Sequence, residues 1–222
     1  MVKLTLSANA GVAVEICGKR IWVDALHTAR QPGFSCVDEA LQKKMLTHEA
    51  FQKPDVICYT HCHPDHYSEE LTKAAGRIWP KARVILPGVD VGDADKQTFS
   101  FEDVTITFLR LPHEGAQYAD TLHFGIFIEG KGRNVLLTGD CAVGCDALRE
   151  MNVDICVVDF PWISLPKGRR ELEQGIRPRT IVACHIPFAQ DDNNGYREVA
   201  AKAAQQMNHV YLLQEPLQSI EM

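Results

Sequence analysis

Short apolar runs separated by polar turns divide this chain into predicted strands. Val104, Ile106 and Phe108 alternate with two threonines, which is typical of a half-buried strand because successive side chains point to opposite faces. The other predicted strands are 4–17 and 21–24, joined as a hairpin by Gly18-Lys19-Arg20; 56–60; 121–129 and 135–139, joined as a hairpin by 130–134; 154–159; 180–184; and 210–213, which closes the chain.

Three other segments have the spacing of apolar residues that is typical of helices. One is 37–51, where Ser35 and Asp38 resemble a capping box. A second follows Ser68, which is placed to cap it, and a third spans 196–207. Because hairpins and helices are interleaved, we expect an α/β (α+β) fold with helices outside packed sheets.

The composition is that of an ordinary globular protein, with 222 residues, 45% of them hydrophobic and 23% charged. We therefore expect a single domain over residues 1–222. The net charge of −6 speaks against a partner that is a nucleic acid or an anionic membrane. Lys167, Arg169 and Arg170 form a local basic group, which we interpret as the solvated start of a helix.

The amino terminus lacks the apolar stretch of a signal peptide, and no segment approaches the ~18 apolar residues of a membrane span. Of the 8 cysteines, Cys58, Cys156 and Cys184 lie within apolar runs, where a free cysteine behaves as a small hydrophobe. Reduced thiols and a cytoplasmic location are the expectation that follows.

The segment Thr60-His-Cys-His-Pro-Asp-His66 contains a dense group of metal-ligand side chains: His61, His63, Asp65 and His66. Alternate residues of an extended segment share a side, and the proline then favours a turn that brings the last two residues round. Imidazole and carboxylate ligands together suit Zn²⁺, Mn²⁺ or Fe²⁺ rather than Ca²⁺.

Three further polar residues come at the ends of predicted strands. They are His113, Asp140 and His185. A rigid sheet can direct such side chains into a site, so these residues are the remaining candidate ligands.

With these residues in this order, the chain resembles the metallo-β-lactamase-fold hydrolase superfamily. The resemblance covers nearly the whole chain, because Asp24 matches the first motif of that family. It implies an αββα four-layer sandwich with a binuclear metal site along one sheet edge. It also implies the division of ligands: His61, His63 and His113 for one metal, Asp65, His66 and His185 for the second, and Asp140 as the bridge. Asp24 would not bind metal but would brace the loop that carries the histidine cluster.

The activity implied by the resemblance is hydrolysis of a small ester, lactone or phosphoester by a bridging water that two divalent metal ions activate. Asp65 would orient that water and later protonate the leaving group. Zn²⁺ is the expected metal, with Mn²⁺ and Fe²⁺ as alternatives. The pair Gly139-Asp140 points away from β-lactam hydrolysis, and the stretch from His113 to Asp140 is most similar to the branch that contains the sugar-phosphate lactonases.

Two other functions stay open: an iron-dependent redox enzyme similar to the persulfide dioxygenases, and a metal-binding protein without catalysis. The substrate is expected to be a small molecule, but the residues do not name it, and they leave the oligomeric state open.

The remaining candidates are interpreted as structural. We expect His123 in a strand, in the core or at a sheet edge, and His27, His48 and His209 at the surface. Cys62, Cys141 and Cys184 adjoin candidate ligands, but neighbours in an extended segment point to opposite sides, which favours packing. Two interpretations, substrate pocket or loop packing, apply to Phe160, Trp162, Phe188 and Asp191.

Overall fold

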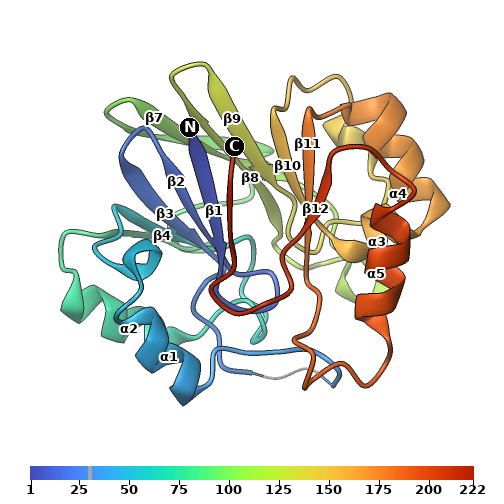
Figure 1. Ribbon diagram of the computed structural model, residues 1–222. Helices are drawn as coiled ribbons and strands as arrows, with labels where there is room; N and C mark the ends of the chain where they lie inside the picture. The colour runs from blue at the N-terminus through green and yellow to red at the C-terminus, as the bar shows by residue number, and fades with distance from the viewer. Residues whose placement is uncertain (30–31) are drawn as a thin grey trace.

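The computed structural model describes residues 1–29 and 32–222, and within these ranges the chain forms two mixed β-sheets that face each other. Helices cover the outer faces, so the layers run helix, sheet, sheet, helix (Figure 1). This is the expected αββα arrangement. Among the described residues, one sheet has the order β13-β1-β2-β3-β4-β5 and the other β12-β11-β10-β9-β8-β7-β6.

The strands of the first sheet are β1 (Val2–Leu6), β2 (Val12–Ile16), β3 (Lys19–Val23), β4 (Val56–Cys58), β5 (Arg83–Ile85) and β13 (Ser219–Glu221). Those of the second are β6 (Lys96–Phe101), β7 (Val104–Arg110), β8 (Phe124–Gly130), β9 (Arg133–Leu137), β10 (Ile155–Asp159), β11 (Thr180–Cys184) and β12 (Val210–Leu212). Within the described ranges, the α-helices are α1 (Glu39–Met45), α2 (Glu69–Ile78), α3 (Phe160–Ser164), α4 (Pro166–Arg170) and α5 (Tyr196–Ala204). There is also a π-helical turn at Glu171–Ile176, and short 3₁₀ helices lie at Glu49–Phe51, Ala116–Tyr118 and Asp146–Leu148.

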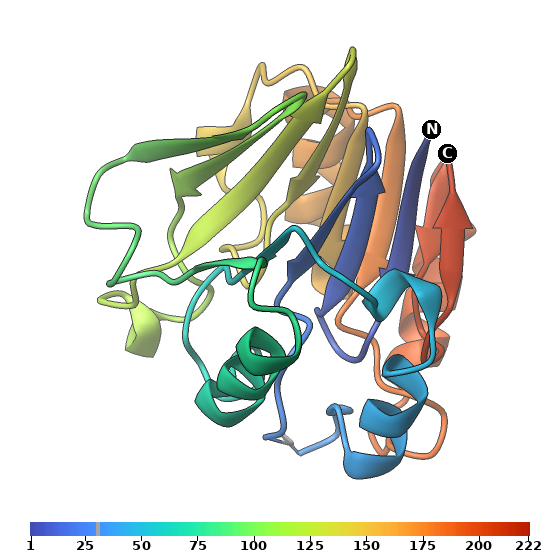
Figure 2. The same cartoon turned by 90° about the vertical axis from the view of Figure 1, so that its left-hand side faces the viewer.

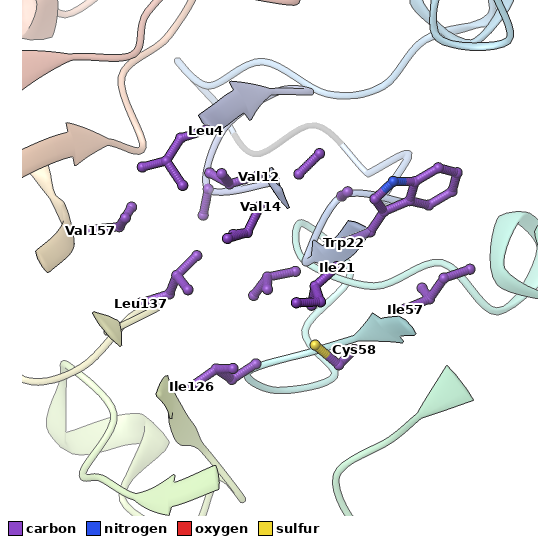
Figure 3. Packing of buried hydrophobic residues seen from close by; sticks show 14 of the residues in the cluster. Leu4, Val12, Val14, Ile21, Trp22, Ile57, Cys58, Ile126, Leu137 and Val157 are labelled. Carbon is purple, nitrogen blue, oxygen red and sulfur yellow. The ribbon is translucent and has the colours of Figure 1, made fainter. Parts of the chain in front are cut away.

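The main core lies between the two sheets. Leu4 and Val14 from the first sheet point toward Ile126, Leu137 and Val157 from the second (Figure 3). All five side chains are buried, which removes their apolar surface from water and holds the sheets together. A second apolar cluster fills the space between the outer face of the second sheet and helices α3 to α5.

Three predictions about residues 4–51 were wrong. The expected single strand at 4–17 is two antiparallel strands, because the segment Ser7–Gly11 turns the chain back. The capping box before α1 does not form: Asp38 caps the helix by accepting from the amide of Leu41, whereas the Ser35 hydroxyl donates to Asp191. The helix is also shorter than 37–51, ending at Met45.

Other predicted elements agree with the structure to within a few residues. Ser68 caps α2 as expected, and β8 and β9 form the predicted hairpin. The expectation that 210–213 closes the chain was wrong, because β13 follows it and pairs with β1. The two termini therefore lie side by side (Figure 2).

The directions of the strands determine where a site can form. β3, β4 and β5 run parallel to one another, as do β9, β10, β11 and β12. Parallel strands bring their carboxyl ends to one edge of a sheet, so the loops that follow these strands meet along the lower edge in Figure 1. Within the described ranges, no helix combines the length and the apolar character needed to cross a membrane.

Candidate metal centre

The candidate ligands from the sequence are brought together at this edge from separate loops. His61, His63, Asp65 and His66 follow β4; His113 follows β7; Asp140 follows β9; and His185 follows β11. Each loop leaves a strand whose apolar side chains are fixed in the core. The positions of the ligands are therefore set by packing of the sheets.

Asp140 lies at the centre of the group. One carboxylate oxygen, Oδ2, is 3.7 Å from Nε2 of His113 and 4.0 Å from Nε2 of His61. The other, Oδ1, is 3.0 Å from Nε2 of His66 and 3.8 Å from Nε2 of His185. The two oxygens thus face two different pairs of histidines, which is the geometry that a bridging carboxylate needs.

Two groups of three residues also have possible ligand atoms close together. Possible ligand atoms of His61, His63 and His113 lie within 4.8 Å of one another, and the same holds for Asp65, His66 and His185. These groups have the same membership as the two ligand sets that the resemblance implies.

The residues fit a metal because their polar atoms are buried without protein partners. Among the described residues, Nε2 of His61, His113 and His185 has no hydrogen-bond partner. Burying such an atom unsatisfied is costly, and several imidazole nitrogens converging on one carboxylate supply the donor set that Zn²⁺, Mn²⁺ or Fe²⁺ prefers.

Asp24 and Thr60 fix the orientation of two of the histidines. The Asp24 carboxylate accepts hydrogen bonds from the Thr60 amide at 2.7 Å, from the Thr60 hydroxyl at 2.6 Å and from Nδ1 of His66 at 3.0 Å. Since the Thr60 hydroxyl donates to Asp24, its oxygen accepts from Nδ1 of His61 at 3.0 Å. These contacts hold the Nδ1 side of both imidazoles in place, so that Nε2 of each ring is directed into the site.

His113 is oriented in the same way by the backbone. Its Nδ1 donates to the Glu114 carbonyl at 2.7 Å, which leaves Nε2 free to act as a ligand. The loop itself is tied to the Asp140 loop, because the Glu114 amide donates to the Asp140 carbonyl and the Glu114 carboxylate accepts from the amide of Val143.

Gly139 allows Asp140 to reach this position. Its φ of +52° lies in the left-handed region that L side chains rarely adopt. A Cβ at this position would also lie 2.7 Å from Oγ1 of Thr60 and 2.8 Å from its Cβ. The glycine therefore lets the strand end pass close to the residue that connects Asp24 with His61.

The electrostatics of the site favour a cation. Burial lowers the pKa of His61, His63 and His185, so these imidazoles are neutral near pH 7. Burial also opposes protonation of His66, but the carboxylates of Asp140 and Asp24 outweigh it and raise the pKa of His66 well above its usual value.

Asp140 shows the converse effect. Burial alone would raise its pKa, but His66 and then His185 hold the pKa well below the usual range. The neutral imidazoles of His61, His63 and His185 around an ionised carboxylate provide lone pairs and negative charge for a cation.

Some residues were missed or misjudged from the sequence. Asp159 ends β10, and its carboxylate, Asp140 and His185 have possible ligand atoms within 4.8 Å of one another. The rule that selected Asp140, a polar residue after an apolar run, would have found it. His27 was expected at the surface, which was wrong: it is fully buried, and its Nε2 contacts the Ala8 carbonyl at 3.1 Å.

The remaining structural interpretations can now be placed. His123 is fully buried and lies just before β8 rather than inside a strand. Trp162 and Phe188 are core residues, as is Phe160. Cys141 and Cys184 are buried, whereas Cys62 is exposed.

Aromatic rings flank the centre on both sides. Tyr118 lies 4.9 Å from the ring of His63 and 4.8 Å from that of His113, measured between ring centroids. On the other side, Phe34 lies 4.7 Å from the ring of His185. Both aromatic rings therefore lie next to candidate ligands.

Known proteins provide an independent comparison. A family model described as "Beta-lactamase superfamily domain" matches residues 19–186. A search of curated proteins found no significant match.

Solved structures of similar fold cover the whole chain. The metallo-beta-lactamase fold protein YhfI from Bacillus subtilis has a TM-score of 0.67 and 14% identity over 99% of this chain and 98% of its own. An isothiocyanate hydrolase from Delia radicum gut bacteria has a TM-score of 0.62 and 16% identity over 99% of both chains. CmlA, a diiron beta-hydroxylase from Streptomyces venezuelae, has a TM-score of 0.59 and 14% identity over 100% of this chain and 54% of its own.

Proposed function

Because the chain belongs to the beta-lactamase superfamily, we propose that it is a binuclear metal-dependent hydrolase acting on a small ester, lactone or phosphoester. The observation that carries this proposal is the position of Asp140. Its two oxygens face His113 and His61 on one side and His66 and His185 on the other. A carboxylate so placed can hold two cations at once.

The ligands would divide into two positions that share Asp140. His61, His63 and His113 would hold one ion, and Asp65, His66 and His185 the other. When bound, two divalent ions lower the pKa of a water molecule and polarise the oxygen of the substrate.

The protein would contribute proton handling through Asp65. Asp65 is only 7% exposed, and one of its carboxylate oxygens lies near the possible ligand atoms of His66 and His185. We assign to it the orientation of the attacking water and the return of a proton to the leaving group. Asp24 and Thr60 would hold the Nδ1 side of His66 and His61, so that Nε2 of both rings faces the metal positions.

A redox enzyme that uses iron is the second candidate. One observation favours it: the fold is shared with a diiron beta-hydroxylase, and imidazole with carboxylate also suits iron. Iron in the purified protein, with oxygen uptake on addition of substrate, would distinguish this function from hydrolysis.

Metal analysis and hydrolysis assays test the proposal together. We expect the purified protein to contain about two metal equivalents. Chelation should abolish hydrolysis of p-nitrophenyl esters, simple lactones or bis-p-nitrophenyl phosphate, and added metal should restore it.

The variant Asp65→Asn should keep at least one metal equivalent and lose hydrolysis by about 10²-fold or more, as expected for a general acid and base. Asp154→Asn is a matched control, because Asp154 is similarly buried but pairs with Arg179 away from the ligands. Full activity of Asp65→Asn, or hydrolysis by metal-free protein, would contradict the mechanism.

A further inference from the structure

Asp159 is a buried carboxylate at the candidate centre that the two ligand sets above do not use. It is the last residue of β10 and pairs with Cys184, the last residue of the neighbouring parallel strand β11. His185 is the next residue after Cys184. Asp159 is 9% exposed. The sheet therefore directs its side chain to the edge where the ligands meet.

The carboxylate of Asp159 has the surroundings of a ligand. Possible ligand atoms of Asp159, Asp140 and His185 lie within 4.8 Å of one another. Its Oδ1 is buried and has no hydrogen-bond partner among the described residues. Among the described residues, no lysine or arginine forms an ion pair with Asp159.

A structural role as a helix cap does not account for this position. Asp159 precedes α3, but its side chain accepts no hydrogen bond from the first turn of that helix. Two buried carboxylates beside each other repel, and they are stable together only if positive charge lies between or beside them. The imidazole of His66 supplies part of that charge, and a divalent cation would supply more.

We propose that Asp159 is an additional carboxylate ligand of the second metal position, the one formed by Asp65, His66 and His185. This inference rests on the proposed binuclear site. It makes the two positions chemically different, since one has three imidazoles and the shared Asp140, and the other has two imidazoles with Asp65, Asp159 and Asp140.

The added carboxylate has a consequence for metal choice. Carboxylate oxygens favour Mn²⁺ and Fe²⁺ relative to Zn²⁺, whereas an imidazole-rich site suits Zn²⁺. The second position should therefore take Mn²⁺ or Fe²⁺ more readily than the first. Replacing Asp159 with asparagine should reduce that preference.

The test compares metal-free full-length wild-type protein with Asp159→Asn and Asp159→Ala. Titration with Mn²⁺ and, separately, Zn²⁺ against a competing chelator gives the number of sites and both affinities. We expect two sites in the wild type, and in both variants an affinity for Mn²⁺ at one site that is lower by about ten-fold or more. Asp154→Asn, at the other end of the same strand, should bind as the wild type does.

Thermal unfolding supplies a readout that a merely structural role would not give. Without metal, Asp159→Asn should unfold at the same temperature as wild type or higher, because a neutral amide of similar size replaces a carboxyl group whose burial beside Asp140 disfavours its charge. With saturating Mn²⁺, its unfolding temperature should rise less than that of the wild type.

The outcomes separate the inference from the proposed function. Two sites in the wild type with unchanged Mn²⁺ affinity in Asp159→Asn would overturn the inference and leave the binuclear site intact. A loss of stability in metal-free Asp159→Asn, with unchanged metal binding, would also overturn it and indicate a structural role. Fewer than two sites in the wild type would contradict the proposed function itself, and the inference with it.

Discussion

The substitution Asp24→Asn tests how the centre is organised, because it changes one atom at a residue outside both proposed ligand sets. Asp24 is 1% exposed and accepts from the Thr60 amide, the Thr60 hydroxyl and Nδ1 of His66. An asparagine can keep one of these contacts through its oxygen, but its amide group then faces hydroxyl and imidazole donors.

Two effects should follow from the geometry. Hydrogen bonds to a charged group contribute about 1.5–3 kcal/mol each, so losing one and straining another predicts a loss of about 2–4 kcal/mol in the free energy of unfolding. His66 can escape the donor clash only by moving its proton to Nε2, which removes the ligand atom. The affinity for metal should then fall by about 10–100-fold.

Both quantities can be measured on the same variant. Urea unfolding in the presence of chelator, followed by tryptophan fluorescence, gives the free energy of unfolding without metal. Competition with a chelating dye gives the affinity. Asp55→Asn is the matched control. Asp55 precedes β4 and accepts a hydrogen bond from the amide of Arg20 in β3 at 2.9 Å, so it connects the same two strands as Asp24 but at their opposite ends.

The control should bind metal as the wild type does and lose less than about 1.5 kcal/mol. If Asp24→Asn binds metal with wild-type affinity and unfolds within about 0.5 kcal/mol of the wild type, the hydrogen bonds of Asp24 do not organise the site, and the reasoning is refuted.

Three further substitutions test other parts of the structure. Burial lowers the pKa of His27 to about 4, so the neutral buried imidazole stabilises the fold fully above pH 6.5. As the pH falls from 6.5 to 4, about 3 kcal/mol of the free energy of unfolding should be lost. His27→Gln should remove this part of the pH dependence of urea unfolding, and an unchanged pH profile would contradict the prediction. Gly139→Ala should lower the free energy of urea unfolding by about 2–4 kcal/mol, because of the positive φ and the contact with Thr60. Its control is Gly132→Ala, where φ is +74° and the space is open, so only the backbone strain of about 1–2 kcal/mol should appear. Equal losses in the two variants would mean that the contact with Thr60 is unimportant. Tyr118→Ala should raise KM for aryl esters up to about ten-fold without changing metal content, because its ring lies 4.9 Å from that of His63 and 4.8 Å from that of His113. An unchanged KM would show that the ring does not contact substrate.

The candidate ligands could be predicted from the sequence because a simple physical rule applies to them. Polar residues that follow apolar strands, such as Asp140 and His185, are carried to a sheet edge by the core packing of the strands. Asp159 also satisfies this rule, because it ends the predicted strand 154–159 and the observed strand β10. The layered fold followed from hairpins interleaved with helices.

Features that depend on distant contacts could not be predicted in this way. The burial of His27 depends on the turn at Ala8, to which it bonds, and its local sequence gives no sign of this. Likewise β13 is stabilised by pairing with β1 from the other end of the chain. The turn between β1 and β2 did have a local signal in the sequence, the segment Asn9-Ala10-Gly11.

The central claim is that Asp140 joins two metal positions, and anomalous diffraction from crystals grown with Mn²⁺ or Zn²⁺ tests it most directly. The predicted result is two anomalous peaks about 3.5–4 Å apart, one on each side of the Asp140 carboxylate. A single peak beside Asp140, or two peaks that do not share it as a ligand, would contradict the account.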